Sequence, residues 1–401
     1  MLNVKGGFGV GIAGKSDMGD IACCVSTSDG DTWSDAVTIF DHNQRHGNLQ
    51  FAYANSILYK PPGQDVIWCY AMRCPMNSRN SEESQLVGAF SADGGRSWSP
   101  VELAMHYTGP LIVVAGIHRL DTPDGPRYLL PAHRNTKRSD PQGTRDQFVL
   151  VSTSLLEWKH GGFIPQPATG KVFLHEGNIA PGKAAGELTM VMRTAKYDVE
   201  GQALEPPRAF SSVSNDLGRT WSAAKEEPDL HNAKSKAFFG RAANGTHIYV
   251  YNDGPAKDRM ALRYKLKPKD GTWSEEKTFS DSGTKNSYPT LIEISPGDWR
   301  AVWDSGTASK ARTNIRFGKL KTPPTELIRR QVWITFEEEK NAATFIPMIG
   351  ADRVMWACDY PHPDSTFPES RHAIARDMGD LSADDVKLIT SDNCRALYGF
   401  A

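Results

Sequence analysis

A chain of 401 residues is long enough to bury a sizeable core and to form two or three domains. Its formal net charge is −1, so no basic excess points to nucleic acid. No window approaches the roughly 18 consecutive apolar residues of a membrane helix, and the first residues lack the apolar core of a signal peptide. As written, with an N-terminus that could be truncated, the sequence predicts a cytoplasmic protein that binds neither nucleic acid nor membrane.

Cysteine usage gives no sign of a metal site. The six Cys residues, at positions 23, 24, 69, 74, 358 and 394, show no CxxC paired with a second CxxC or an HxxxH. Cys is among the residue types most often buried. We therefore expect reduced and mostly buried thiols, no metal and no cofactor.

A short motif that ends in Trp recurs along most of the chain. In chain order the copies are 26–33 (STSDGDTW), 91–98 (SADGGRSW), 152–158 (STSLLEW), 214–221 (SNDLGRTW) and 270–273 (DGTW). The second and fourth copies share S-x-D-x-G-x-[ST]-W, the first moves its Asp by one position, and the others are degraded. Successive Trp residues lie 52 to 65 positions apart, which suits one four-stranded antiparallel sheet with its loops.

The motif has a mechanical explanation. Asp and Ser side chains accept hydrogen bonds from the backbone of a tight turn, and Gly supplies its positive φ. The Trp then anchors the turn between neighbouring sheets. Flanking runs such as 147–152 (QFVLVS) and 247–251 (HIYVY) are typical of strands. Residues 1–325 are therefore predicted to form a mainly β fold, a β-propeller.

The motif resembles the Asp box of the sialidase and BNR-repeat superfamily. This resemblance implies a six-bladed β-propeller whose sixth blade comes from residues 286–293 and 314–320. Asp boxes lie at the rim in that family and are structural, so they carry no information about catalysis.

The same resemblance implies an ordered set of catalytic residues. Segments 174–181 and 186–194 are similar to those that carry the family's Glu and central Arg, here Glu176 and Arg193. Segment 252–259 is similar to the loop that delivers a further Arg, here Arg259, and 286–289 to the segment that presents the Tyr, here Tyr288. A Tyr nucleophile needs a neighbouring base, the leaving group needs an acid, and Arg residues suit a sugar carboxylate.

The leading interpretation is thus a retaining, sialidase-like glycoside hydrolase that acts on an acidic sugar. Tyr288 is the expected nucleophile, Glu176 its base, and Asp17 the acid/base, with Asp20 in reserve. Arg193 and Arg259 are expected to bind the carboxylate. One element of the family pattern is missing, because the first Arg of this chain is Arg45, beyond the first box. The activity is therefore expected to be impaired.

Two other functions stay open. The first is a carbohydrate-binding or scaffolding propeller without catalysis, which the missing Arg favours. The second is a uronate lyase, in which His or Tyr abstracts the proton next to a carboxylate. Its possible residues are His42, His46, His118, His133 and Arg134, and we also expect His46 and His118 to contact the substrate.

The last residues, 326–401, follow a β-α-β-α pattern that does not belong to a propeller. Segments 356–370 (WACDYPHPDSTFPES) and 393–400 (NCRALYGF) resemble the C-terminal end of the amidohydrolase-2 family of metal-dependent barrel enzymes. In that family the Asp that matches Asp359 binds the metal. The other ligands are missing, so Asp359 and His362 are expected to be a relic. So small a segment should pack on the propeller or pair with another copy, giving a homo-oligomer.

Overall fold

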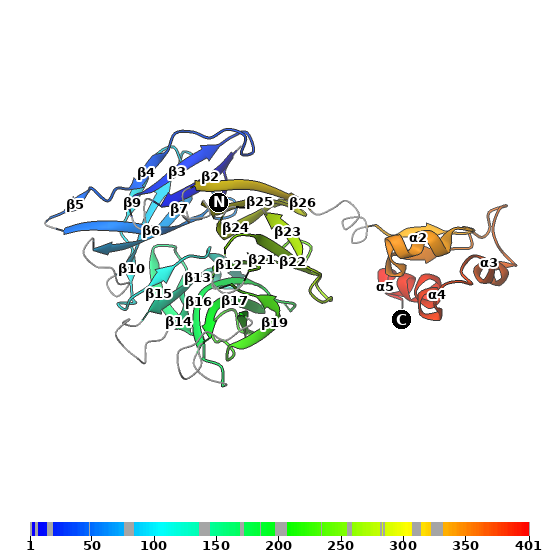
Figure 1. Cartoon of the computed structure of the whole chain (residues 1–401). Helices are drawn as coiled ribbons and strands as arrows, with labels where there is room; N and C mark the ends of the chain where they lie inside the picture. Colours follow the sequence, from blue (N-terminus) through cyan, green and yellow to red (C-terminus); the bar gives the residue numbers. More distant parts are fainter. Residues whose placement is uncertain are drawn as a thin grey trace. The chain divides into compact units, whose positions relative to one another are not determined.

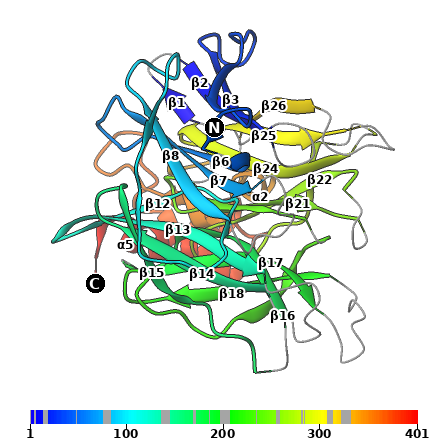
Figure 2. The same cartoon turned by 90° about the vertical axis from the view of Figure 1, so that its left-hand side faces the viewer.

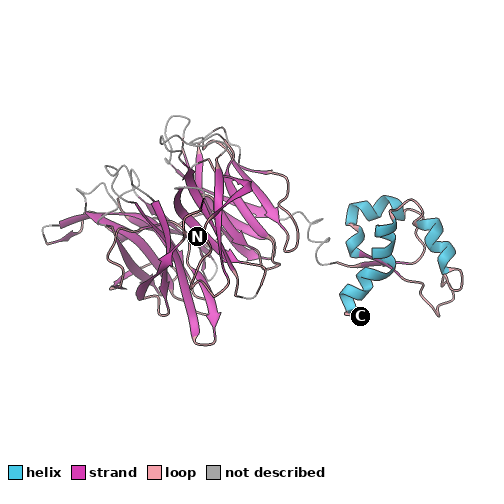
Figure 3. Ribbon diagram, turned by 90° about the horizontal axis from the view of Figure 1, so that it is seen from below, coloured by secondary structure: helices cyan, strands magenta, loops and turns pink. Residues whose placement is uncertain are grey.

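The computed structural model describes residues 2–4, 7–13, 19–47, 49–75, 84–135, 145–168, 172–184, 186–196, 207–233, 235–254, 259–280, 283, 285–306, 314–321 and 332–400. The chain divides into two compact units, Met1–Leu320 and Lys321–Ala401. The first contains the strands of a propeller, and the helices lie in the second (Figure 3). None of the described helices is long and apolar enough to cross a membrane.

The N-terminal unit consists of successive sheets whose described strand pairs are mainly antiparallel, whereas β10 and β15 are parallel. The first sheet holds β1 (Leu2–Val4), β2 (Gly7–Ala13), β3 (Ile21–Ser26) and β4 (Val37–Phe40). The second holds β5 (Arg45–His46), β6 (Leu49–Tyr59), β7 (Ile67–Pro75), β8 (Gln85–Ser91) and β9 (Ser99–Val101). The third holds β10 (Ala104–Met105), β11 (Ile112–Val113), β12 (His118–Thr122), β13 (Gly125–Asn135), β14 (Arg145–Ser152) and β15 (Glu157–Phe163).

The remaining sheets continue in chain order. The fourth holds β16 (Val172–Pro181), β17 (Leu188–Lys196), β18 (Arg208–Ser214) and β19 (Lys225–His231). The fifth holds β20 (Phe238–Arg241), β21 (His247–Asn252), β22 (Leu262–Lys267) and β23 (Lys277–Ser280). The last holds β24 (Asn286–Ser295), β25 (Asp298–Ser305) and β26 (Asn314–Lys321).

The β-propeller arrangement is confirmed, but the prediction of six full blades is wrong. Five sheets have four or more strands, whereas the sheet β24–β25–β26 has three among the described residues. From Lys321 onward the chain belongs to the second compact unit, and none of the other described strands pairs with β24, β25 or β26.

Apolar cores lie between consecutive sheets, as radial packing requires. Tyr70 of β7 and Trp158 of β15 pack edge to face with ring centroids 5.6 Å apart and join the second and third sheets. Further cores join the first sheet to the second, the third to the fourth, the fourth to the fifth, and the fifth to the last.

The Trp-ending motifs form the turns that the sequence predicts. In the second copy, Asp93 Oδ1 accepts the backbone N–H groups of Arg96 and Ser97 at 3.0 and 2.9 Å, and Ser91 Oγ accepts that of Gly95 at 2.8 Å. The fourth copy repeats these bonds around Asp216. The Trp at the end of each is packed, and Trp158 is fully buried even though its motif is degraded.

The first copy differs because its Asp is displaced. Ser28 takes the capping position, where its Oγ accepts the N–H of Thr32 at 2.8 Å. Asp29, which has φ +54°, therefore does not cap the turn. Its two carboxylate oxygens accept hydrogen bonds from Nε and Nη2 of Arg300 at 2.6 and 2.8 Å. Lys319 of β26 adds a third contact at 2.9 Å. This set of contacts, the Asp29 latch, joins the first sheet to the last, which lie side by side in Figures 1 and 2.

The C-terminal unit has the β-α-β-α order that the sequence predicts. Its strands β27 (Ile334–Phe336) and β28 (Val354–Trp356) are parallel. Its helical segments are α2 (Ala342–Ile349), η3 (Ala351–Arg353), α3 (Ser370–Asp377), α4 (Ala383–Lys387), η4 (Leu388–Asp392) and α5 (Asn393–Tyr398). They enclose a small core around Ile346, Val354, Met378 and Ile389.

Candidate active site

Two β-bulges of the same kind, one in β16 and one in β24, present the central residues of the site. In the β16–β17 ladder His175 pairs with Arg193 and the next pair is Asn178 with Val191, so Glu176 and Gly177 bulge out. In β24 the pairs Ser287–Asp304 and Thr290–Val302 leave Tyr288 and Pro289 outside the ladder in the same way. A bulge redirects a side chain away from the alternation of the sheet.

Both bulged residues adopt a backbone conformation that is rare for their type. Glu176 has φ +53° and Tyr288 has φ +56°, both in the left-handed region. Such a residue costs on the order of 1–3 kcal/mol and persists only where its surroundings fix it. The same bulge occurs in β6, where Asn55 has φ +56°. The second, fourth and last sheets therefore share the same bulge, in which the first bulged residue has a left-handed backbone conformation.

Glu176, Arg193 and Tyr288 converge although they come from three strands. The Tyr288 hydroxyl donates to Glu176 Oε1 at 3.0 Å. Arg193 Nη1 donates to Glu176 Oε2 at 2.8 Å and to the Tyr288 oxygen at 3.2 Å. Glu176 is 8% exposed and the Arg193 side chain 13% exposed, so solvent screens this ion pair little.

Arg259 joins this cluster from the loop between β21 and β22. Its guanidinium carbon lies 5.3 Å from the ring centroid of Tyr288, which is within range of a cation–π contact. Its carbonyl accepts the N–H of Asn286 at 2.6 Å, and Asn286 Nδ2 donates to the carbonyl of Met260 at 2.6 Å. The start of β24 thus holds the Arg259 loop and Tyr288 together. The structure brings together four of the residues that the sequence predicts for the site.

The electrostatics of the cluster keep the phenol neutral and the carboxyl ionised. Burial and the charge of Glu176 raise the pKa of Tyr288 to about 12, against the opposing charges of Arg193 and Arg259. Burial alone would raise the pKa of Glu176. The positive charge of Arg193 and the hydrogen bonds from Arg193 and Tyr288 outweigh burial and lower this pKa below its ordinary value. A neutral phenol thus faces a carboxylate that can accept its proton.

Two further ionisable residues at the site were not predicted. Lys236, 2% exposed, precedes β20, and its ammonium donates to the carbonyl of Pro289 at 2.8 Å and contacts Thr290 Oγ1 at 3.3 Å. Burial lowers its pKa to about 8, although Glu176 and Asp304 oppose this. Burial raises the pKa of Asp304 to about 6, against Lys236 and Arg259.

The remaining predicted residues are Asp17 with its alternative Asp20, His46 and His118. Asp17 is outside the described residues. Asp20, its alternative, accepts the N–H of His42 at 2.7 Å and contacts the His42 ring at 2.5 Å. His46 lies in β5. His118 lies in β12, where burial lowers its pKa to about 4, and no hydrogen bond or ion pair found in the described ranges joins it to Tyr288.

Among the side chains that the structure describes, the residues considered for lyase chemistry form no cluster of their own. The His133 ring is buried behind the bulge, and its Nδ1 accepts the N–H of Glu176 at 3.5 Å. Burial lowers its pKa to about 3, so it is neutral. Arg134 pairs with Asp146 at 2.9 Å and lies over the ring of Phe163. His133 therefore supports the Glu176 bulge.

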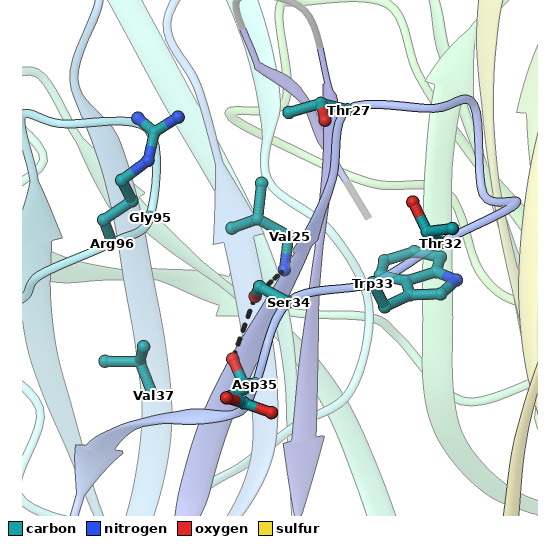
Figure 4. A pocket seen from close by; sticks show the side chains of 9 residues that line it. All are labelled: Val25, Thr27, Thr32, Trp33, Ser34, Asp35, Val37, Gly95 and Arg96. Atoms are coloured by element: carbon teal, nitrogen blue, oxygen red, sulfur yellow. Dashed lines mark hydrogen bonds between the residues drawn. The ribbon is translucent and has the colours of Figure 1, made fainter.

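A hollow of about 510 Å³ lies elsewhere, between the first two Trp-ending turns (Figure 4). It is lined by Val25, Thr27, Thr32, Trp33, Ser34, Asp35, Val37, Gly95 and Arg96. Trp33 is 36% exposed, and its ring meets Phe317 of the last sheet edge to face. None of the four clustered residues lines this hollow.

The C-terminal unit does not fit a catalytic metal. Ligand atoms of Asp359, His362 and Asp364 lie within 4.8 Å of one another, so a third potential ligand accompanies the predicted pair. Their side chains are, however, 60%, 65% and 77% exposed, and His362 Nδ1 is already bonded to Asp364. A catalytic metal site needs ligands held by a surrounding shell, which this exposed loop lacks.

The successive, mainly antiparallel sheets form a sialidase-like β-propeller fold. The BNR repeat-like domain family matches residues 8–299, and the chain belongs to that family. The amidohydrolase family matches residues 293–400, which include β25 and β26. None of the curated proteins compared matches the chain.

Solved structures resemble the propeller at low sequence identity. A protein of unknown function from Dyadobacter fermentans is 16% identical, with 75% of this chain and 84% of that one covered and a TM-score of 0.55. A K499G mutant of NanB sialidase from Streptococcus pneumoniae is 10% identical, covers 78% and 66%, and scores 0.57. Trypanosoma rangeli sialidase with the inhibitor DANA is 13% identical, covers 82% and 55%, and scores 0.58. The chain spans about two thirds or less of the length of these sialidases, and the likeness establishes the fold.

Proposed function

We propose that the propeller hydrolyses a glycosidic bond of an acidic, sialic-acid-type sugar, with Tyr288 as nucleophile. The 3.0 Å hydrogen bond from the Tyr288 hydroxyl to Glu176 carries this proposal. It provides a nucleophile and a base in contact, from strands that are far apart in the sequence, as nucleophilic catalysis requires.

The pKa values constrain how the proton moves. The phenol has a pKa of about 12 and the pKa of Glu176 is below its ordinary value, so complete proton transfer before attack is strongly unfavourable. The proton therefore passes to Glu176 while the phenol oxygen bonds to the anomeric carbon and the bond to the leaving oxygen breaks. Arg193 Nη1, 3.2 Å from the phenol oxygen, stabilises the charge that develops there. An acid, assigned to Asp17, protonates the leaving oxygen, and water then releases the sugar.

The charge balance favours an acidic substrate. The guanidinium of Arg259 lies beside the ring of Tyr288, and a guanidinium at this position suits the carboxylate of an acidic sugar. The fold relatives include a Trypanosoma rangeli sialidase solved with sialic acid, which is consistent with this substrate class. With fewer Arg residues than the family pattern, the chain should bind the carboxylate more weakly.

A panel of 4-methylumbelliferyl sialosides tests the proposal. Wild type should release the fluorophore, Tyr288→Phe should not, and Tyr107→Phe should behave as wild type, because Tyr107 donates to the Pro110 carbonyl outside the cluster. Equal turnover by wild type and Tyr288→Phe would refute it. Binding without any product would instead support a non-catalytic carbohydrate-binding propeller. Absorbance near roughly 235 nm from a uronate polymer would indicate β-elimination.

A further inference from the structure

The bulges that present Glu176 and Tyr288 lie in the fourth and last sheets, and the fifth sheet stands between them. The segment that enters this fifth sheet, Lys236–Ala237, contacts the bulge of β24 directly and the bulge of β16 through Asn178, the residue that follows it. Toward β16, Asn178 Nδ2 donates to the carbonyl of Ala237 at 3.1 Å and to that of Glu176 at 3.2 Å. Toward β24, the Lys236 ammonium donates to the carbonyl of Pro289, the residue after Tyr288, at 2.8 Å.

We propose that Lys236 is a positioning residue: with the Ala237 carbonyl, it holds the two bulges at the separation that keeps Tyr288 on Glu176. This inference rests on the proposed function, because it assigns Lys236 to the same catalytic pair. Lys236 itself touches neither the reacting phenol oxygen nor the carboxylate of Glu176 through any hydrogen bond found in the described residues.

The cost of burying this ammonium supports a specific role. A buried Lys loses its hydration, and such residues are rarely kept unless they are paired. Here the ammonium has one main-chain carbonyl and one hydroxyl as acceptors, and the charges of Glu176 and Asp304 favour it. The Pro289 carbonyl belongs to the bulge of β24, and Thr290 is the first residue after it, so both contacts hold this part of the strand in place while Tyr288 keeps its left-handed conformation.

The consequence for catalysis follows from the sensitivity of nucleophile and base to their separation. A displacement of about 1 Å can cost about 100-fold in rate. The Arg193 bridge cannot compensate alone, because its contact with the phenol oxygen is 3.2 Å long and depends on the same placement of Tyr288. Losing the Lys236 anchor should therefore lower kcat far more than it changes KM.

The test compares Lys236→Met with Lys236→Arg and with a matched control, Arg241→Met. Arg241 lies in the fifth sheet and, like Lys236, donates to a main-chain carbonyl, that of Gly182 at 2.8 Å. It contacts neither bulge. We expect Lys236→Met to lower kcat on the sialoside panel about 10- to 100-fold with KM changed less than about threefold. Lys236→Arg should recover a large part of the loss, and Arg241→Met should keep the wild-type kcat.

A second measurement does not depend on turnover. In protein labelled with ¹³C-tyrosine, the Cζ resonance of Tyr288 is identified by its loss in Tyr288→Phe. Lys236→Met should move this resonance toward its position in Glu176→Gln, whereas Arg241→Met should leave it in place. If wild type hydrolyses no sialoside but the resonance moves, the positioning role stands and the proposed function fails.

The inference is overturned if Lys236→Met leaves both kcat and the Tyr288 resonance unchanged, or if Arg241→Met changes them equally. Should Lys236→Met fail to fold, Thr290→Val replaces it, because it removes only the hydroxyl that lies 3.3 Å from the ammonium. That variant should lower kcat about two- to fivefold and move the resonance in the same direction; no change in either would also overturn the inference.

Discussion

The Asp29 latch should contribute measurably to the stability of the propeller, and Asp29→Asn tests this. Hydrogen bonds from Arg300, and then Lys319, lower the pKa of Asp29 from 3.8 to about 2, although burial opposes this. Such a shift corresponds to about 2.4 kcal/mol. The Asp29 side chain is 40% exposed, so solvent screening reduces this contribution to about 1–1.5 kcal/mol. In Asp29→Asn, the Arg300 side chain, which is 5% exposed, keeps only the carboxylate of Asp298 as a partner. This raises the expected loss of folding free energy to about 2 kcal/mol.

Thermal unfolding followed by circular dichroism measures the loss. Asp29→Asn should lower Tm by about 2 to 5 °C at pH 7. Asp31→Asn is the control, because Asp31 is 77% exposed and 3.8 Å from Lys319, and it should change Tm by less than about 1 °C. Since the folded pKa of Asp29 is depressed, its contribution is present above about pH 4 and is lost as the pH falls toward 2. Equal Tm values for the two variants at pH 7 would refute the latch.

Three further predictions concern the core and the site. Trp158→Ala should lower the free energy of unfolding by about 3–5 kcal/mol, because the side chain is fully buried. Trp33→Ala should lower it by less than half as much, because Trp33 is 36% exposed. Equal losses of free energy in urea unfolding would contradict this. Glu176→Gln should lower kcat on the sialosides about 10²- to 10⁴-fold, and an unchanged kcat would exclude Glu176 as the base. Burial raises the pKa of Asp304 to about 6, so wild type should lose about 3 kcal/mol of folding free energy relative to Asp304→Asn as the pH rises from about 4 to above 6; a pH-independent difference would contradict this.

The sequence was informative where function depends on local patterns. The Trp-ending turns predict sheets and their order, because each turn closes within eight residues or fewer. The order of Glu176, Arg193, Arg259 and Tyr288 identified residues that the structure places in contact. Asp304 could have been found by the same logic, since it pairs beside the Tyr288 bulge as Arg193 pairs beside the Glu176 bulge.

Other features could not be predicted, because they depend on contacts between distant segments. Asp29 meets Arg300 across 271 positions of the sequence, and only the closure of the ring brings them together. Lys236 has no motif around it, and a Lys in a polar segment is normally exposed. That the last sheet has three strands among the described residues was missed, because strand-like segments suggest a blade, whereas the number of strands in a sheet depends on pairing between segments.

Because β6, β16 and β24 share the same bulge, the number of residues in each of these strands determines which side chains it presents. In each of these strands two residues stand opposite one residue of the neighbouring strand. Deleting one residue, such as Gly177, would restore regular pairing and return the Glu176 side chain to a face of the sheet. The ladder would survive, but Glu176 would no longer meet Tyr288. Insertion or deletion of a single residue in one of these strands therefore changes which side chains face one another without changing the core between the sheets.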